Sequence, residues 1–250
     1  MLAAVFLGIA GVCRAQSFDQ HFLDRTLRLD YTFSGNNHQQ QIYLDEMRQS
    51  EGWFGRRVNM DSLLLQGNGQ ITVSDTTGVV LYRHSFSTLF QEWQSTEEAT
   101  RVSKSFENVF LVPMPKHTVD VTVTLFDTHR QVRSSLKHRV NPQDILIRPV
   151  QEGQKWEYLR RSGDSREKID VAFVAEGYRQ DEMDVFRRDC EESIGAMLSH
   201  EPFRSMADRF NFVAVYSPST DSGVSIPHQG VWKRTAADSH FDTFYSQRYL

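Results

Sequence analysis

The fold of this chain is decided by a stretch with a period of two, RTLRLDYTF (residues 25–33). From its third residue onward, leucine or aromatic side chains occupy every second position, with charged or hydroxyl side chains between them. This alternation predicts a β-strand with one face buried and the other exposed. The segment HTVDVTVTLFD (residues 117–127) repeats the pattern with valines and a leucine.

Shorter strand-like runs fill the region around these two segments. They are QIYLDEM (41–47), GQITVSD (69–75), GVVLYRHSF (78–86), ENVFLVP (107–113) and DILIRP (144–149). Clusters of glycine, asparagine and serine, as at Ser34–Asn37 and Gly67–Gly69, predict turns between several of them. Because many short strands follow one another without a convincing amphipathic helix, we expect residues 16–150 to form an antiparallel β-sandwich.

The rhythm changes after a polar stretch, residues 150–170, which we interpret as a junction between domains. IDVAFVAEGY (169–178) is a nearly continuous apolar run, as expected of a strand buried on both faces. Apolar residues then recur at helical spacing over Met183–Met197, with Asp181 as the expected N-cap. RFNFVAVYSP (209–218) predicts a second strand, which completes a βαβ unit with two parallel strands.

The expected fold is therefore α+β, with a β-sandwich in residues 16–150 and a partial α/β domain in residues 151–250. A single βαβ unit is too small to cover its own outer faces. We therefore expect the region after Val150 to be the less stable part of the chain.

The first fifteen residues differ from the rest. MLAAVFLGIAGVC (1–13) is apolar but too short to span a bilayer, so residues 1–15 are expected to be a signal peptide cleaved after Ala15. This predicts a secreted, periplasmic or cell-surface location. Lipid attachment at Cys13 is disfavoured because bulky Val12 precedes it, and no later segment reads as a transmembrane helix.

Composition narrows the classes of function. Of the 250 residues, 39% are hydrophobic and 12% aromatic, which is enough for packed cores. The chain has 28 Lys and Arg residues and 32 Asp and Glu residues, which gives a formal net charge of −4, and it has no basic stripe. We therefore expect no nucleic-acid partner. Apart from Cys13 the chain has one cysteine, Cys190, which excludes an internal disulfide after signal cleavage.

The pentapeptide HEPFR (200–204) comes within one residue of the zinc-binding motif H-E-x-x-H. The motif needs two imidazoles one turn apart on a continuous helix, and Pro202 would interrupt that helix. Arg204 stands in place of the second ligand, and a guanidinium cannot bind zinc. We therefore interpret His200 as a residue near a helix C-terminus, where a positive partial charge is favourable.

Other polar residues are weaker candidates for a site. Asp238, His240 and Asp242 alternate in ADSHFDTF and, with His228 nearby, could suit a divalent ion. STDSGVS offers Ser222 and Ser225, but without the G-x-S-x-G elbow of a catalytic serine.

A cleft at the carboxyl edge of the parallel strands is the more general expectation, because α/β proteins tend to bind ligands there. Glu176 and Asp221 lie near strand ends and could line it, although capping of turns is the favoured role for both carboxylates. The residues that we consider as lining the cleft are Glu176, Tyr178, Asp221, Ser222 and His228.

Four stretches taken together resemble a known family. They are HSFSTLFQEW (84–93), VAFVAEGYRQDEM (171–183), EPFRSMADRFNFVAVYSPSTDSGVSIP (201–227) and GVWKRTAADSHFDTFYSQRYL (230–250). They are similar to the IgA peptidase family, metallopeptidase family 64, whose members are secreted bacterial zinc endopeptidases.

The resemblance implies an N-terminal β-sandwich followed by a zincin-like catalytic domain. It also implies a zinc-activated water that attacks the peptide bond, with a glutamate as base. In the family the motif H-E-x-x-H-x-x-G-x-x-D follows the segment that matches FDTFYSQRYL, and this sequence stops at Leu250 before it. No zinc ligand or catalytic glutamate transfers to a position here, so we expect the chain itself to bind no zinc cofactor and to be inactive.

Two hypotheses follow. The first is the N-terminal portion of a secreted zinc metalloendopeptidase whose substrate is a protein, with immunoglobulin or another host glycoprotein as the candidate. The alternative is a non-catalytic secreted module whose sandwich binds a host glycoprotein or glycan through exposed aromatic residues such as Trp53, Phe54 and Trp93.

Overall fold

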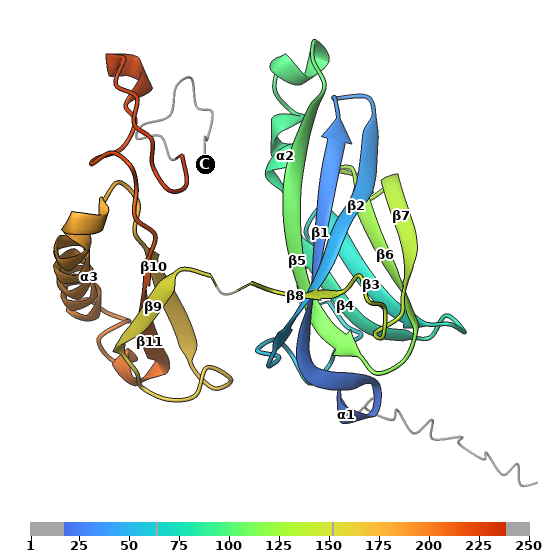
Figure 1. Ribbon diagram of the computed structural model, residues 1–250. Helices are drawn as coiled ribbons and strands as arrows, with labels where there is room; N and C mark the ends of the chain where they lie inside the picture. Colours follow the sequence, from blue (N-terminus) through green and yellow to red (C-terminus); the bar gives the residue numbers. More distant parts are fainter. Residues whose placement is uncertain (1–17, 64, 152, 239–250) are drawn as a thin grey trace, which may run out of the picture. The chain divides into compact units, whose positions relative to one another are not determined.

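The computed structural model describes residues 18–63, 65–151 and 153–238, which form two compact units that divide after Val150 (Figure 1). The first unit contains two four-stranded sheets, and the second contains one three-stranded sheet with a long helix.

The first sheet of the first unit has the strand order β5-β1-β2-β8. Strand β1 pairs antiparallel with β2 on one side and with β5 on the other, whereas the short β8 runs parallel to β2. A short helix, α1, leads into β1. The bounds are α1 Phe18–His21, β1 Phe22–Gly35, β2 Gln40–Glu51, β5 Lys104–Pro115 and β8 Arg148–Pro149.

The second sheet is antiparallel throughout, with the order β4-β3-β6-β7. Two short helices, α2 and the 3₁₀ helix η1, connect it to β5. The bounds are β3 Gly69–Asp75, β4 Val80–Phe86, α2 Leu89–Trp93, η1 Glu98–Thr100, β6 Val119–Phe126 and β7 Val132–Val140.

Both sheets contribute their apolar faces to one core. Leu27 and Phe33 of β1 and Val121 and Val123 of β6 have no exposed surface and belong to the same cluster. Each such side chain contributes about 1.5–3 kcal/mol when it is fully buried. The alternation in residues 25–33 and 117–127 thus marks the two core strands, as predicted, and the antiparallel β-rich fold is confirmed.

The interpretation of the first region missed two elements. Strand β7 was missed because VRSSLKHRV is mostly polar, which suits a strand at the edge of its sheet with an exposed outer face. Helix α2 was missed because it has only five residues. Its start is fixed by Thr88, whose side-chain oxygen accepts a hydrogen bond from the Gln91 amide.

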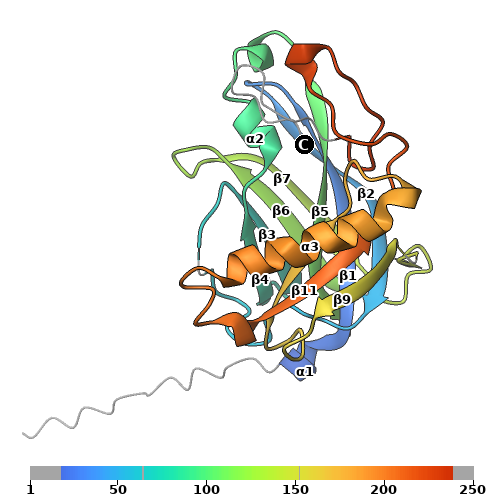
Figure 2. The ribbon, with the colours of Figure 1, turned by 90° about the vertical axis from the view of Figure 1, so that its left-hand side faces the viewer.

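In the second unit, parallel strands β10 and β11 are joined by helix α3, and β9 pairs antiparallel with β11. The sheet order is β10-β11-β9, and α3 lies across the sheet in Figure 2. The predicted βαβ unit is confirmed. The bounds are β9 Lys155–Arg160, β10 Ile169–Val174, α3 Met183–Leu198 and β11 Phe210–Tyr216; 3₁₀ turns lie at η2 Gln180–Glu182, η3 Ala207–Arg209 and η4 Pro227–Gln229.

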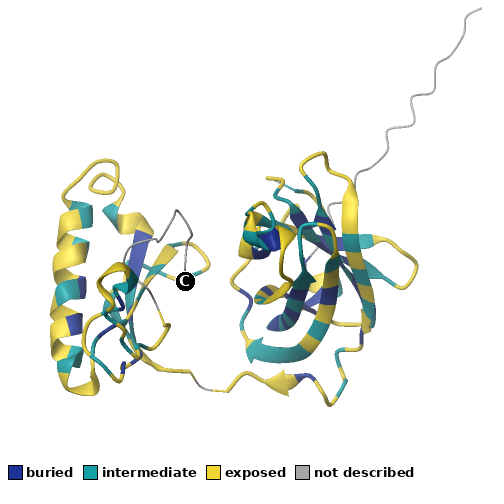
Figure 3. Ribbon diagram, turned by 90° about the horizontal axis from the view of Figure 1, so that it is seen from above, coloured by how far each residue is buried: buried dark blue, intermediate teal, exposed yellow. Residues whose placement is uncertain are grey.

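Helix α3 packs on the sheet through the predicted apolar stripe. Its Phe186 and Cys190 are buried and form one cluster with Ala175 and Ala214, whereas most of its other positions are exposed (Figure 3). Burial raises the pKa of the Cys190 thiol to about 11, so the thiol stays protonated at neutral pH. Cys190 is therefore a small apolar side chain of the core, as expected.

Three expectations for the second unit were wrong. The polar junction contains strand β9, which is stabilised by pairing with β11. Strand β10 is not buried on both faces, because it lies at the edge of the sheet and leaves Ile169 and Val174 more than half exposed. Asp181 does not cap α3, because it lies inside the η2 turn and the helix begins only at Met183.

The near-motif HEPFR lies just beyond the end of α3. The ring nitrogen Nδ1 of His200 is 2.9 Å from the Ala196 carbonyl oxygen in the last turn, and Arg204 pairs with Glu201 at 2.8 Å. The assignment of His200 to a helix C-terminus is therefore confirmed. Within residues 18–238, leaving aside 64 and 152, no helix combines the length and the apolar character needed to cross a membrane.

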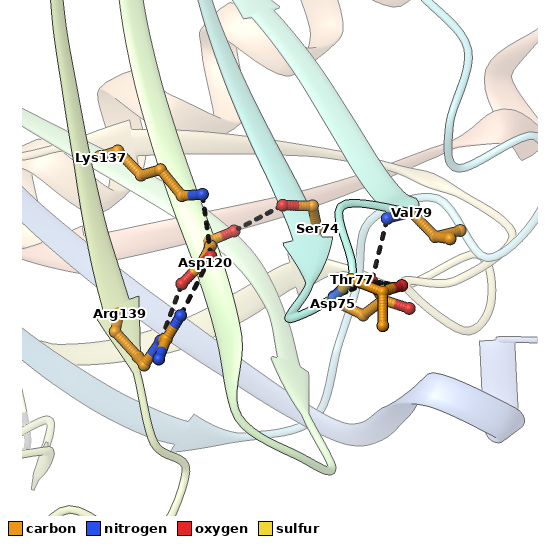
Figure 4. Close-up of polar contacts among 7 residues, drawn as sticks. All are labelled: Ser74, Asp75, Thr77, Val79, Asp120, Lys137 and Arg139. Atoms are coloured by element: carbon orange, nitrogen blue, oxygen red, sulfur yellow. Dashed lines mark hydrogen bonds and ion pairs between the residues drawn. The ribbon is translucent and has the colours of Figure 1, made fainter.

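A buried carboxylate ties two strands of the second sheet together. Asp120 of β6 forms ion pairs of 2.9 Å with both Lys137 and Arg139 of β7 (Figure 4). Hydrogen bonds and charge from these cations lower the pKa of Asp120 from 3.8 to about 2. At the nearby β3–β4 turn, the Asp75 carboxylate accepts the Thr77 and Val79 amides, each at 2.9 Å (Figure 4).

We predict that Asp120→Asn destabilises the first unit at neutral pH and not in strong acid. The pKa is lower in the folded state, so the stabilisation is complete above about pH 4 and disappears as the pH falls towards 2. Urea unfolding midpoints of wild type and variant should differ at pH 7 and converge near pH 2. Glu51→Gln removes a pair between exposed side chains and is the control, expected to leave the midpoint unchanged.

We also predict that limited proteolysis cuts the second unit before the first. Its sheet exposes large apolar side chains, with Trp156 56% and Val174 55% exposed, so the free energy of opening should be lower there. Mass spectrometry of a brief trypsin digest should show a resistant fragment ending near Val150. Equal resistance of both units would contradict this expectation.

Candidate functional site

Two loops meet at the carboxyl edge of the parallel strands. The β10 loop (residues 175–182) leads from β10 into α3, and the β11 loop (residues 217–238) follows β11. Their main chains bond directly, because the Ser219 amide donates to the Tyr178 carbonyl and the Gly223 amide to the Gly177 carbonyl, both at 2.7 Å. The βαβ connection thus has a polar carboxyl edge built from two loops.

Ser219 holds this edge together. Its hydroxyl oxygen accepts the Gly177 amide and the Ala236 amide, each at 3.0 Å, and the residue is only 7% exposed. Gly177 has a φ of +77°, and a Cβ there would lie 2.8 Å from the Gly223 carbonyl oxygen. The close approach of the loops therefore depends on a glycine at 177.

Glu176 and Tyr178 are both engaged in contacts that fix the β10 loop. One carboxylate oxygen of Glu176 accepts the Ala237 amide at 2.8 Å, which ties the far end of the β11 loop to the β10 loop. The Tyr178 hydroxyl donates to Asp189 of α3 at 2.7 Å. That hydrogen bond, together with burial, raises the pKa of Tyr178 to about 12, so the phenol remains protonated at neutral pH.

Asp221 and Ser222 fix the β11 loop. The Asp221 carboxylate accepts the Arg234 amide at 2.8 Å and the Arg234 guanidinium at 3.3 Å, which holds the pKa of Asp221 below its usual value. The Ser222 hydroxyl donates to Glu182 at 2.9 Å, at the start of α3. Glu182 in turn accepts the Arg179 amide at 2.8 Å.

His228 lies further along the β11 loop, in the η4 turn closed by the bridge between Ile226 and Val231. Its Nε2 is 3.2 Å from the side-chain amide nitrogen Nε2 of Gln229. The structure therefore gathers Glu176, Tyr178, Asp221 and Ser222 where the two loops are bonded to each other, and it places His228 in a separate turn.

The contacts of these four residues hold the loops in their conformation. Both carboxylates hold main-chain amides, as in the turn-capping alternative, and Ser222 is bonded to a carboxylate. Ser225 bonds the main chain of Lys233, accepting from its amide at 2.9 Å. We find here a preorganised edge rather than a nucleophile paired with a base.

The described part of the chain does not fit a zinc ion. Within it, no three His, Cys, Asp or Glu side chains lie together as a possible ligand set. The candidate metal motif of Asp238, His240 and Asp242 lies mostly outside the described residues, because these end at Asp238.

The two units match two parts of one family. The family model described as Peptidase M64 N-terminus matches residues 17–137, in the first unit, and the model described as IgA Peptidase M64 matches residues 158–250, in the second. The chain belongs to the M64 peptidase family. The resemblance noted from the sequence is confirmed over almost all of the chain after residue 16. Comparison with curated proteins gives no match.

The match with the peptidase model covers all of the β10 and β11 loops, and thus every residue that we considered as lining the cleft. The non-catalytic alternative loses two of its three aromatic anchors, because Trp53 is 4% exposed and Trp93 packs against Phe90 and Phe106. Phe54 alone of the three is well exposed, at 61%.

Sequence reasoning missed the residues that organise the edge. Ser219 and Arg234 stand in loop sequence without periodicity, and their roles depend on a contact made across 17 and 13 residues, respectively. The one available signal was Gly177 directly after an apolar run, which indicates a turn with positive φ.

We predict that Gly177→Ala destabilises the second unit by about 1–3 kcal/mol, because alanine is strained at positive φ and its Cβ meets the Gly223 carbonyl. Gly195→Ala is the matched control, because this glycine lies within α3 with open space around its Cβ position. The control should be neutral or stabilising by about 0.5–1 kcal/mol. Urea dependence of hydrogen exchange in α3 measures both effects, and an equal response of the two variants would refute the tight-loop account.

Proposed function

We propose that this chain forms the N-terminal unit and the opening part of the catalytic unit of a secreted zinc metallopeptidase that cleaves proteins. The match of residues 158–250 to the IgA Peptidase M64 model carries this proposal. As substrate we propose immunoglobulin, because the family description names IgA, or another host glycoprotein. The apolar segment 1–13 supports secretion.

The architecture of the second unit supports a zincin-like assignment for it. Its mixed sheet has a parallel pair of strands, one crossover helix on one face and polar loops at the carboxyl edge. These are features expected of the first part of an α/β peptidase domain. The edge supplies scaffolding, because Ser219, Glu176 and Asp221 fix the loops through main-chain amides. Side chains that touch a substrate would then be held in place by these contacts.

We further propose that the 250 residues alone do not hydrolyse peptide bonds. The sequence contains no H-E-x-x-H, and the described residues offer no ligand set for zinc. Without the metal there is neither a Lewis acid nor an activated water, so partial activity is not expected.

The test is metal content and proteolysis by the purified chain. After incubation with zinc and dialysis, elemental analysis should find no stoichiometric zinc, and labelled casein and immunoglobulin should remain intact. The variants His200→Ala and His228→Ala should behave like wild type. Zinc-dependent cleavage that 1,10-phenanthroline abolishes would overturn the inactivity, and its loss in His228→Ala alone would show that this histidine is a ligand.

The family function itself is tested separately by the coding sequence that follows the Leu250 codon. An H-E-x-x-H encoded there, when added to the chain, should give zinc binding and protein cleavage. Cleavage that replacement of its glutamate by glutamine does not reduce would contradict the proposed mechanism.

A further inference from the structure

The outer face of the first sheet is hollowed in two places. One hollow, of about 400 Å³, is lined by the middle of β1, β2 and β5, including Arg28, Asp30, Asp45 and Glu107. The other, of about 620 Å³, is lined by the ends of the same strands and their loops. Its residues are Ser34, Gly35, Gln39, Gln41, Ser103, Lys104 and Ser105.

The two hollows follow one another along the strands. On β1, Thr32 lines the first hollow and Ser34 the second. On β5, Glu107 lines the first hollow and Ser105 the second. The lined part of β1 runs from Arg28 to Gly35, which spans roughly 24 Å at about 3.4 Å per residue. We call this surface the outer groove; its length suits a chain-like ligand.

Tyr43 lines neither hollow itself but stands on β2 between residues that do. It pairs with Thr32 across the strands and stands on the same face of β2 as Gln41 and Asp45, one from each hollow. Its hydroxyl donates to the Gln41 side chain, and the residue is 50% exposed. A half-exposed ring with a bonded hydroxyl offers a flat apolar surface beside the mostly polar lining, to which Val109, also 50% exposed, adds a second apolar side chain.

The charges of the outer groove exclude anionic ligands. The first hollow has four carboxylates and one guanidinium, and Arg28 is already paired with Asp30 at 2.7 Å. The only cation in the second hollow's lining, Lys104, is paired with Glu98 at 2.7 Å. Phosphates, nucleic acids and sulfated chains would therefore meet net repulsion.

The main chain of the central strand under the groove is already paired. Strand β1 is bonded to β2 on one side and to β5 on the other, so an extended peptide cannot add to it as a new strand. Over β1, recognition must use side chains, here the hydroxyls, amides and carboxylates of Thr32, Gln41, Asp45 and Glu107. Such groups bond well to neighbouring hydroxyls, and Tyr43 can stack on the apolar face of a sugar ring.

We propose that the outer groove binds a neutral oligosaccharide, with Tyr43 as the stacking platform and Glu107 and Asp45 as hydrogen-bond acceptors. The site belongs to the first unit and is independent of peptide-bond cleavage. A peptidase unit linked to it would be held near substrates or surfaces that carry such sugars, which raises the local concentration of its targets.

The experiment measures binding by the full chain to three neutral probes, chitohexaose, mannohexaose and xylohexaose, by isothermal titration calorimetry. At least one should bind, and Tyr43→Ala should weaken its affinity by about tenfold or more through loss of stacking. Glu107→Gln should also weaken it. Glu51→Gln, on the same strand as Tyr43 but outside both hollows, should bind like wild type.

Thermal unfolding of each variant separates loss of binding from loss of folding. Binding that survives Tyr43→Ala and Glu107→Gln overturns the assignment of the groove. Failure of all three hexasaccharides to bind at millimolar concentration overturns the proposal itself. Decalysine is tested in parallel, and Tyr43→Ala should not weaken whatever affinity the wild type has for it. If decalysine binds and none of the oligosaccharides does, the groove is a site for basic peptides and the proposal is wrong. None of these outcomes depends on peptidase activity.

Discussion

The core strands of this protein carry apolar faces that must be covered, and the two units meet this constraint to different degrees. In the first unit the sheets cover each other, so that Leu27, Phe33, Val121 and Val123 lose all contact with water. In the second unit α3 covers one face of the sheet through Phe186 and Cys190. Burial of this kind is the largest favourable contribution to folding, so it determines where the structure is firm.

The consequences reach the polar parts of both units. Because the first sheet places its apolar side chains inward, its outer face is free to carry the hydroxyls, amides and carboxylates of the outer groove. The hydrogen bond from Tyr178 to Asp189 fixes the β10 loop to α3. Because the loop is fixed, its main chain can stay bonded to the main chain of the β11 loop. The match to the IgA Peptidase M64 model covers both loops.

Elements with a strong local pattern could be predicted from the sequence. Strands β1 and β6 alternate strictly, and α3 has an apolar stripe, so their own residues indicate one buried face. Strands β7 and β9 have no such pattern. Each becomes a strand by pairing with an apolar neighbour, β7 with β6 and β9 with β11. The wrong expectation for β10 has a related cause. An apolar run shows that a strand can be buried, but burial on both sides depends on neighbours that its sequence does not specify.

The sequence by itself determined the strand-rich first region, the βαβ unit after it, the resemblance to the M64 family and the lack of an H-E-x-x-H motif among these residues. It also named residues of the carboxyl edge, because strand ends can be recognised locally. Only the tertiary structure decided what those residues do. Glu176 and Asp221 accept amides from Ala237 and Arg234, 61 and 13 residues further along the chain, and Ser219 joins both loops. Such contacts depend on how the chain returns on itself, and no local pattern of residues encodes that return.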